Sequence, residues 1–261
     1  MKEYFKDRIY VVTGASSGIG EEICRQLAQH GAKIVAFGRD ENRLQTLISE
    51  LEGDSHIFVT LDIKDTLKIE ESLNFVVNKK GKLSGLVHSA GIAQTMLLRD
   101  TDILKAKEIL DINLLSFFAL AKSALKMGRY EKGFMSVVAL SSIAAFNNQA
   151  ALSVYAASKA GLNAACASLA SEYAKRGVRF NTIAPSYVTT PMTDSFRQIL
   201  GDDKYYKKIK EIMPFGEILP KDVAQLALFL LSHNSSKITG ECIKITSGGG
   251  DINENILLST K

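Results

Sequence analysis

Three residues of this chain have the types and spacing needed to move a proton. Tyr155 and Lys159 are four residues apart in a stretch with helical spacing, and Ser142 lies thirteen residues upstream of Tyr155. Residues four apart share one helix face, with Cβ atoms roughly 6 Å apart. A lysine ammonium at that place is expected to lower the tyrosine pKa from its usual ~10. Ser142 would then hold a substrate oxygen while Tyr155 gives or takes its proton.

A Tyr-x-x-x-Lys pair is also what an ordinary helix with a solvated lysine contains, so the surrounding elements must decide between the two interpretations. The 261 residues are 46% hydrophobic and 23% charged, with four prolines and no linker or repeat, which is typical of a soluble globular protein. We expect a single domain over residues 1–250, followed by a polar tail at 251–261.

Composition argues against several other classes of protein. The charged start and the lack of a long apolar run predict neither a signal peptide nor a membrane span. Cys24, Cys166 and Cys242 lack the spacing of a disulfide framework or a metal site, so we expect reduced thiols, no metal and a cytoplasmic location. The basic segment 204–210 contains two tyrosines, but we interpret it as a solvated helix face and expect no nucleic-acid partner.

Short apolar runs alternate with longer amphipathic ones along the chain, a pattern that predicts βα units and a parallel sheet. Seven strands are predicted, at 8–13, 33–37, 56–61, 83–88, 136–140, 178–183 and 241–246. The segment 190–215, between the last two strands, is more polar and is interpreted as an insertion that closes over the substrate as a lid. The intervening helices include 19–30, 103–126, 153–175 and 222–232.

A glycine-rich turn follows the first predicted strand and opens the first long helix. Glycines at a strand-to-helix turn permit a tight bend and let the backbone approach a pyrophosphate. The helix N-terminus adds unpaired N–H groups and a partial positive charge for that anion. The turn therefore predicts a dinucleotide cradle made by Gly14, Ser16, Ser17, Gly18, Ile19 and Gly20.

The end of the second predicted strand indicates which dinucleotide binds. Many such folds place an acidic residue there to hold the ribose hydroxyls. This chain has Arg39 at that place, and a guanidinium suits a 2′-phosphate, so NADP(H) is favoured over NAD(H). Asp40 follows and is interpreted as the cap of the next helix.

Together these features resemble the short-chain dehydrogenase/reductase family over nearly the whole chain, and the closing elements resemble 3-oxoacyl-carrier-protein reductases. The resemblance implies an α/β fold: one doubly wound, Rossmann-type domain with a seven-stranded parallel sheet. It also implies a catalytic tetrad of Asn113, Ser142, Tyr155 and Lys159, in which Asn113 holds a water of a proton relay. Tyr155 and Lys159 would also contact the cofactor. The other implied cofactor contacts are Asp62, Ile63, Ala90, Gly91, Pro185, Val188 and Thr190.

The chain departs from the family pattern at three positions. His88 and Ser89 replace two asparagines of the family's Asn-Asn-Ala-Gly motif, and Ser186 replaces the glycine after Pro185. We interpret His88 as a buried histidine whose ring is hydrogen-bonded to backbone. Ser171 stands where carrier-protein reductases tend to have an arginine, which argues against a carrier-bound substrate.

The implied reaction is hydride transfer between NADPH and a small-molecule carbonyl or secondary alcohol, by a homotetramer or homodimer. Three alternatives stay open from the sequence. One is an NAD(H)-dependent alcohol or sugar dehydrogenase, another an isomerase or dehydratase on the same scaffold, and the third a nucleotide-binding regulatory protein that has lost catalysis. The substrate itself is not indicated.

Overall fold

A computed structural model of the chain describes residues 2–147 and 149–249, and in it seven parallel strands form one sheet. The strand order is β3-β2-β1-β4-β5-β6-β7, as a doubly wound fold requires. The order reverses between β1 and β4, so a crevice is expected at their carboxyl ends. The strands are β1 (Ile9–Thr13), β2 (Lys33–Gly38), β3 (Ile57–Thr60), β4 (Leu83–His88), β5 (Ser136–Leu140), β6 (Arg179–Pro185) and β7 (Cys242–Ile245).

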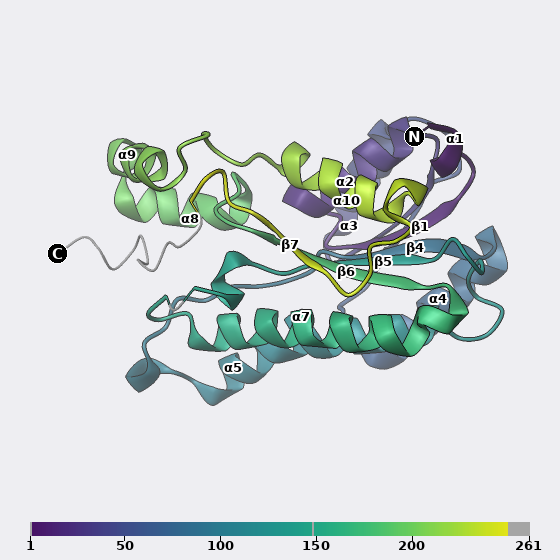
Figure 1. The fold of residues 1–261 in the computed structure, drawn as a ribbon, viewed down its shortest axis with the longest axis horizontal. Helices are drawn as coiled ribbons and strands as arrows, with labels where there is room; N and C mark the ends of the chain where they lie inside the picture. Colours follow the sequence, from purple (N-terminus) through teal and green to yellow (C-terminus); the bar gives the residue numbers. More distant parts are fainter. Residues whose placement is uncertain (1, 148, 250–261) are drawn as a thin grey trace.

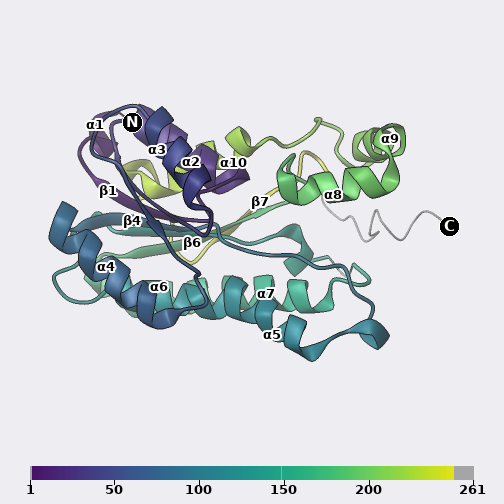
Figure 2. The same cartoon turned by 180° about the vertical axis from the view of Figure 1, so that it is seen from behind.

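Helices cover both faces of the sheet (Figures 1 and 2). One face carries α2 (Gly18–Gln29), α3 (Glu41–Glu50) and α10 (Pro220–Leu231), and the other carries α4 (Thr66–Lys80), α6 (Ser116–Ala124) and α7 (Ser153–Tyr173). The remaining helices are α1 (Lys2–Phe5), α5 (Ile103–Leu110), α8 (Pro191–Leu200) and α9 (Asp202–Ile212). Both α8 and α9 lie beyond the sheet at one end of the molecule (Figure 1).

The apolar runs of the central strands are explained by this double cover. Every residue of β1, β4 and β5 is buried, and two hydrophobic clusters form, one on each side of the sheet. In α2, Ile23, Cys24 and Leu27 are buried on the sheet side, and the helix ends before Gly31, which has a φ of 84°. The predicted helix stop at Gly31 is confirmed.

The predicted helix at 103–126 differs from the structure because its middle is not α-helical. A π-helical turn, η2 (Asp111–Leu115), separates α5 from α6. Such turns have one more residue in each hydrogen-bonded loop than an α-helix and frequently occur at functional sites. The turn carries Asn113, whose side chain is completely buried and makes hydrogen bonds outside the helix.

The end of the chain differs from the sequence pattern in smaller ways. Helix α10 begins two residues before the predicted start, at Pro220, where Leu219 N–H donates to the Asp222 carboxylate at 2.8 Å. The predicted insertion at 190–215 forms helices α8 and α9. The predicted tail at 251–261 lies outside the described residues. Among the residues described, no helix is both long and apolar enough to cross a membrane.

Candidate active site

Two adjoining cavities open at the carboxyl ends of the strands, where the strand order reverses. One contains the predicted catalytic residues Ser142, Tyr155 and Lys159 in its wall. The other runs along the glycine-rich turn. Gly91 and Thr190 line both cavities, so the two form one continuous crevice. Its place agrees with the ligand crevice of open α/β sheets.

The glycine-rich turn fits a cofactor because two of its glycines leave no room for a side chain. A Cβ on Gly20 would lie 2.4 Å from the Gly14 carbonyl oxygen, and one on Gly14 would lie 2.8 Å from Ala90 N. Gly14 and Gly18 also have φ values of 66° and 60°. The backbone of Gly14 and Gly18 lines the second cavity at the N-terminus of α2, as a pyrophosphate site requires.

Three residues that were predicted to contact the cofactor lie at the far end of this groove. Arg39 and Asp62 line it and are exposed, and Ile63 lies beside them. Asp40 accepts a hydrogen bond from Arg43 N–H at 3.0 Å, so its predicted role as the cap of α3 is confirmed. Ser16, Ser17, Ile19, Ala90 and Gly91 also line this groove, whereas Gly20, which was predicted with them, does not.

Tyr155 and Ser142 lie in the wall of the first cavity and contact each other. Tyr155 is on the first turn of α7, and Ser142 is the second residue after β5. Burial raises the pKa of Tyr155, whereas the hydrogen bond with Ser142 lowers it. Since the Ser142 oxygen accepts from Ala144 N–H at 3.1 Å, its own O–H is free to donate toward the phenol oxygen. The pair can therefore hold one substrate oxygen between two hydroxyl groups.

Lys159 differs from the sequence expectation in its electrostatic effect. Its Nζ donates to the Leu140 carbonyl at 2.7 Å and lies 5.8 Å from the centroid of the Tyr155 ring. The pKa of Tyr155 is raised by burial, not lowered by this ammonium, because Lys159 is turned toward the end of β5. Burial also lowers the pKa of Lys159 to about 8.

The buried lysine predicts a pH dependence of stability. Its pKa is near 10.5 in the unfolded chain and about 8 in the folded one, so unfolding binds a proton between these values. The stabilising contribution is full above about pH 10.5 and is lost as the pH falls through about 8. Between about pH 8 and about pH 9.5, the free energy of unfolding of the wild type should rise relative to Lys159→Met, by about 1 kcal/mol per pH unit. Thermal melts of both proteins at several pH values would measure this difference. If the stability of the two proteins changed with pH in parallel, the prediction would be contradicted.

Asn113 is the predicted catalytic residue that does not line a cavity wall. Its side chain accepts from Ile92 N–H at 2.9 Å and donates to Ile92 O and to Ser158 Oγ, both at 3.0 Å. A Cβ on Gly91 would lie 3.3 Å from both Asn113 Oδ1 and Lys159 Nζ. The structure thus places Asn113 beside the lysine and the crevice, and its predicted role in holding a water stays a prediction.

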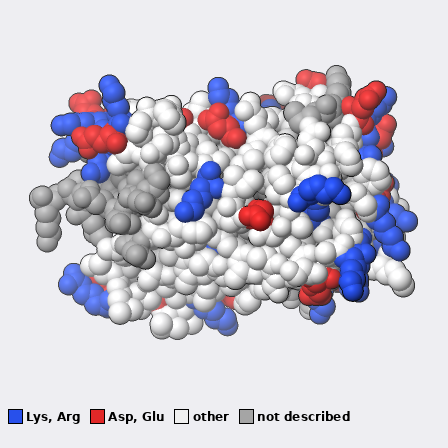
Figure 3. Space-filling view, in the orientation of Figure 1, with Lys and Arg blue, Asp and Glu red and all other residues white. Residues whose placement is uncertain are grey.

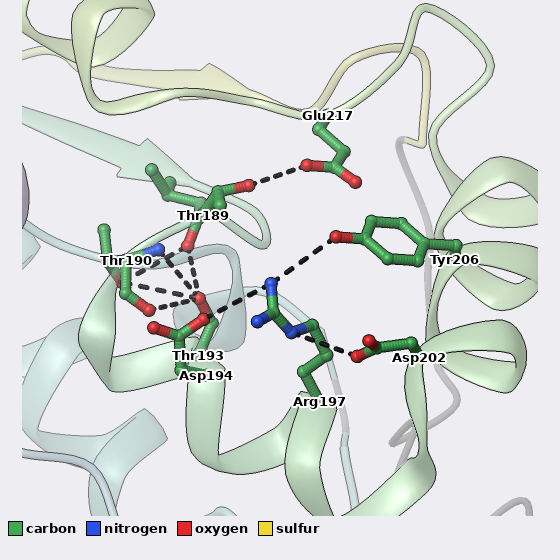
Figure 4. Close-up of polar contacts among 9 residues, drawn as sticks. Thr189, Thr190, Thr193, Asp194, Arg197, Asp202, Tyr206 and Glu217 are labelled. Atoms are coloured by element: carbon green, nitrogen blue, oxygen red, sulfur yellow. Dashed lines mark hydrogen bonds and ion pairs between the residues drawn. The ribbon is translucent and has the colours of Figure 1, made fainter.

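The segment after β6 joins the two cavities and leads into α8. Pro185, Val188 and Thr190 line the first cavity, as predicted for cofactor contacts. Figure 4 shows how this segment is held: Thr193 Oγ1 donates to Val188 O at 2.7 Å, and Thr189 Oγ1 donates to Glu217 at 2.9 Å. These bonds fix the strand end against α8, whose Met192 and Thr193 also line the first cavity.

Helices α8 and α9 are joined to each other by Arg197. Its guanidinium lies 3.2 Å from Asp202 and 3.8 Å from Asp194, and it donates to the Tyr206 hydroxyl at 3.4 Å (Figure 4). Of the aromatic and apolar residues in this insertion, Tyr205 and Met213 are buried in the core cluster, whereas Phe215 is 88% exposed. Tyr205 and Met213 therefore pack within the protein and do not face a substrate.

Sequence reasoning missed several polar residues of the first cavity, including Thr95, Gln149 and Ser186. Gln149 lies in the loop between Ser142 and Tyr155, and Ser186 follows Pro185, so their proximity in sequence to predicted residues was the available signal. Ser186 Oγ is buried and has no hydrogen-bond partner among the described residues. A buried hydroxyl in that condition is suited to a ligand group.

Comparison with known proteins identifies the family. The family model described as Enoyl-(Acyl carrier protein) reductase matches residues 14–249, from the glycine-rich turn to the end of the described chain. The chain belongs to the short-chain dehydrogenase/reductase family. It is 34% identical to the 3-oxoacyl-[acyl-carrier-protein] reductase FabG of Rickettsia prowazekii, over 91% of this chain and 95% of that protein. It is also 34% identical to carbonyl reductase family member 4 of Xenopus laevis, over 92% of this chain and 97% of that protein.

Solved structures of the family have the same fold. An actinorhodin polyketide ketoreductase with NADPH has a TM-score of 0.87 and 26% identity, covering 97% of this chain and 99% of that one. A short-chain dehydrogenase/reductase of Brucella melitensis has a TM-score of 0.84 and 26% identity, covering 94% of this chain and 97% of that one. The prediction of a doubly wound fold of this family is confirmed, and the chain is an NAD(P)-dependent oxidoreductase.

Proposed function

We propose that this member of the family is an NADPH-dependent ketoreductase with a tetrad of Asn113, Ser142, Tyr155 and Lys159. The observation that carries the proposal is the position of Ser142, Tyr155 and Lys159 in the wall of one cavity that continues into the glycine cradle. A carbonyl held at the hydroxyls of Ser142 and Tyr155 would then lie beside the groove that suits the cofactor. Residues 1–250 would form the single NAD(P)-binding domain.

NADPH, when bound, supplies the hydride that reduces the carbonyl carbon. Ser142 donates a hydrogen bond to the carbonyl oxygen and polarises it. Tyr155 gives its proton to the same oxygen as the alcohol forms. Lys159 would hold the ribose next to the nicotinamide. The cofactor's phosphates would bind at Gly14 to Gly20 and its adenosine at Asp62 and Ile63.

The preference for NADPH over NADH is proposed from Arg39. Its guanidinium is exposed at the end of β2 in the cofactor groove, and the described residues show no hydrogen bond or ion pair that occupies it. A 2′-phosphate would be bound there by two charge-assisted hydrogen bonds. A relative of this chain in the solved structures, the actinorhodin ketoreductase, was crystallised with NADPH.

Arg39→Ala should therefore reduce the ratio of kcat/KM for NADPH to kcat/KM for NADH by about 10- to 100-fold, the loss of a paired charged contact. Arg43→Ala is the matched control, because Arg43 is a neighbouring arginine on α3 that pairs with Asp40 at 3.3 Å and does not line the groove. Initial rates with both cofactors measure the ratio. An unchanged ratio in Arg39→Ala would show that this side chain does not select the cofactor.

The substrate is proposed to be a ketone with a second polar group near its carbonyl. The cavity wall is largely apolar, with Ile143, Ala144 and Leu152 close to the catalytic residues. It also contains the Ser186 hydroxyl, which has no hydrogen-bond partner in the described part of the chain. A 3-oxoacyl ester or thioester has this chemistry, and several relatives are 3-oxoacyl-[acyl-carrier-protein] reductases. The insertion formed by α8 and α9 would close over it.

NADPH consumption with a matched panel tests this assignment. The panel contains a short 3-oxoacyl thioester, a plain aliphatic ketone of equal length and a ketose sugar. We expect kcat/KM to be highest for the thioester and the advantage over the plain ketone to shrink in Ser186→Ala. Turnover of the sugar in preference to both would instead favour a sugar dehydrogenase.

We also infer that the active form is a tetramer. Ile103, Leu104 and Phe118 on α5 and α6 are 74%, 77% and 43% exposed, and a second copy would bury them. The face with α7, β7 and α10 has few charged side chains in its middle, which suits a second interface (Figure 3). Light scattering should give the mass of four chains for the wild type and of two chains for Leu104→Glu. A monomeric wild type would contradict the inference.

A further inference from the structure

His88 is a buried histidine that the proposed reaction does not use. It is the last residue of β4, where the family pattern has an asparagine, and its ring is completely buried. Nδ1 lies 3.3 Å from Thr13 Oγ1 on the neighbouring strand β1, and Nε2 lies 3.3 Å from the carbonyl oxygen of Asn113. The ring thus connects the start of the glycine-rich turn with the π-helical turn that carries Asn113.

The neighbouring atoms determine which nitrogen carries the proton. A carbonyl oxygen only accepts, so Nε2–H must donate to Asn113 O. In the neutral ring Nδ1 is then an acceptor and takes the Thr13 O–H. Thr13 Oγ1 in turn accepts from Ala90 N–H at 3.2 Å. Every donor in this series has an acceptor, which is what a buried polar network requires.

The ring must also be neutral. Burial and the nearby Lys159 ammonium lower the pKa of His88 to about 3, and its hydrogen bond to Asn113 O acts in the opposite direction. The other groups against the ring are uncharged: Phe117 of α6, 5.7 Å away between ring centres, Thr13 and the backbone of Asn113. Protonation would place a second buried positive charge near Lys159 and would make Nδ1 a donor toward Thr13.

The position of Asn113 matters because its side chain holds the loop beside the lysine. Its amide oxygen accepts from Ile92 N–H and its amide nitrogen donates to Ile92 O, next to Gly91. A Cβ on Gly91 would be equally close, at 3.3 Å, to Asn113 Oδ1 and Lys159 Nζ. A small displacement of Asn113 therefore moves the wall between the two cavities, and displacements of about 1 Å can reduce turnover about 100-fold.

We propose that His88 is a positioning residue whose Nε2–H tautomer, fixed by the Asn113 carbonyl and matched by the Thr13 hydroxyl, holds Asn113 and thereby sets the Gly91–Ile92 loop against Lys159. The hydrogen-bond arrangement is independent of the reaction, whereas its effect on turnover rests on the proposed function. The two parts are tested separately.

The tautomer is tested by nitrogen NMR of the imidazole rings in the intact protein. The chain has only four histidines, and His88→Gln identifies the signal of this one by its disappearance. We expect a protonated Nε2 and an unprotonated Nδ1, unchanged from about pH 5 to about pH 8, over which an ordinary histidine titrates. A protonated Nδ1, or titration within this range, would overturn the proposal without any assay of function.

The effect on turnover is tested by two substitutions with different hydrogen-bonding ability. Glutamine places an N–H donor near the position of Nε2 and offers an acceptor, whereas leucine fills similar space and offers neither. His88→Gln should keep kcat within about 5-fold of the wild type, and His88→Leu should lower it on the order of 10- to 100-fold. Equal losses in both variants would overturn the proposal.

A double-mutant cycle separates positioning from loss of general stability. In an Asn113→Ala background, His88→Leu should lower kcat by less than about 3-fold, because the side chain that transmits its effect is already absent. Phe117→Leu is the control for packing, since it removes the ring beside His88 but none of its hydrogen bonds, and it should lower the melting temperature without lowering kcat. Additive losses in the cycle would contradict the proposed route through Asn113.

If the wild type reduces no ketone, the proposed function fails while the NMR result still decides the tautomer.

Discussion

Replacing Tyr155 with phenylalanine is expected to lower kcat for ketone reduction by about 10²- to 10⁴-fold, the usual contribution of a positioned proton donor. The substitution removes one oxygen from a half-buried ring in the cavity wall, and the ring still fills its place. The affinity for NADPH, measured by fluorescence titration, should change by less than about 3-fold, because the groove that suits the cofactor is lined by other residues. A loss confined to kcat would identify the phenol as the proton donor.

Tyr130→Phe provides the control for this substitution. Tyr130 is buried and pairs with Leu83 at the opposite end of β4, so it is remote from the cavity. Its variant should retain wild-type turnover. If Tyr155→Phe matched the wild type as well, another group would supply the proton and the assignment of the tetrad would be wrong.

The second large effect is expected at Gly20, where an added methyl group should abolish tight cofactor binding. A Cβ there would lie 2.4 Å from Gly14 O and 2.8 Å from Gly14 C, and neither backbone atom can move without opening the turn. Opening the turn displaces the N–H groups that would bind the pyrophosphate. We expect the Kd of Gly20→Ala for NADPH to rise on the order of 100-fold, measured by calorimetry.

Gly161→Ala is a matched control, since Gly161 also lies inside a helix and is also close to its neighbour. There the nearest atom is Leu114 Cδ2 at 3.0 Å, the far end of a side chain that can rotate away. The variant should bind NADPH within about 3-fold of the wild type and be at least as stable, because alanine favours helix over glycine. Equal affinity of the Gly20→Ala variant and the wild type would mean that the pyrophosphate binds elsewhere.

Much of the fold was predictable because its elements have strong local patterns. The strands that became β1, β4 and β5 are rich in apolar residues, as expected for strands covered on both faces. The position of the crevice follows from the same pattern, since the glycine-rich turn directly follows β1. Local spacing also predicted the pairing of Tyr155 with Lys159 on α7.

The features that were not predicted depend on contacts between distant parts of the chain. The π-helical turn at Asp111–Leu115 has no local signature, and it is tied to bonds from Asn113 to Ile92 and Ser158. The orientation of Lys159 toward Leu140 depends on where β5 ends relative to α7. The ring of His88 was correctly interpreted as bonded to backbone, but its contact with Thr13 follows only from the register of β1 and β4.

The most direct test of the account follows the hydride itself. The protein is incubated with a 3-oxoacyl thioester and NADPH deuterated on the transferred face of C4, and the product alcohol is analysed by mass spectrometry and proton NMR. We expect one deuterium per product molecule, bound to the carbinol carbon, and about 10²-fold or more less labelled product from Tyr155→Phe in the same time. An alcohol product without deuterium at that carbon, or equal labelled product from both proteins, would contradict the proposed reaction.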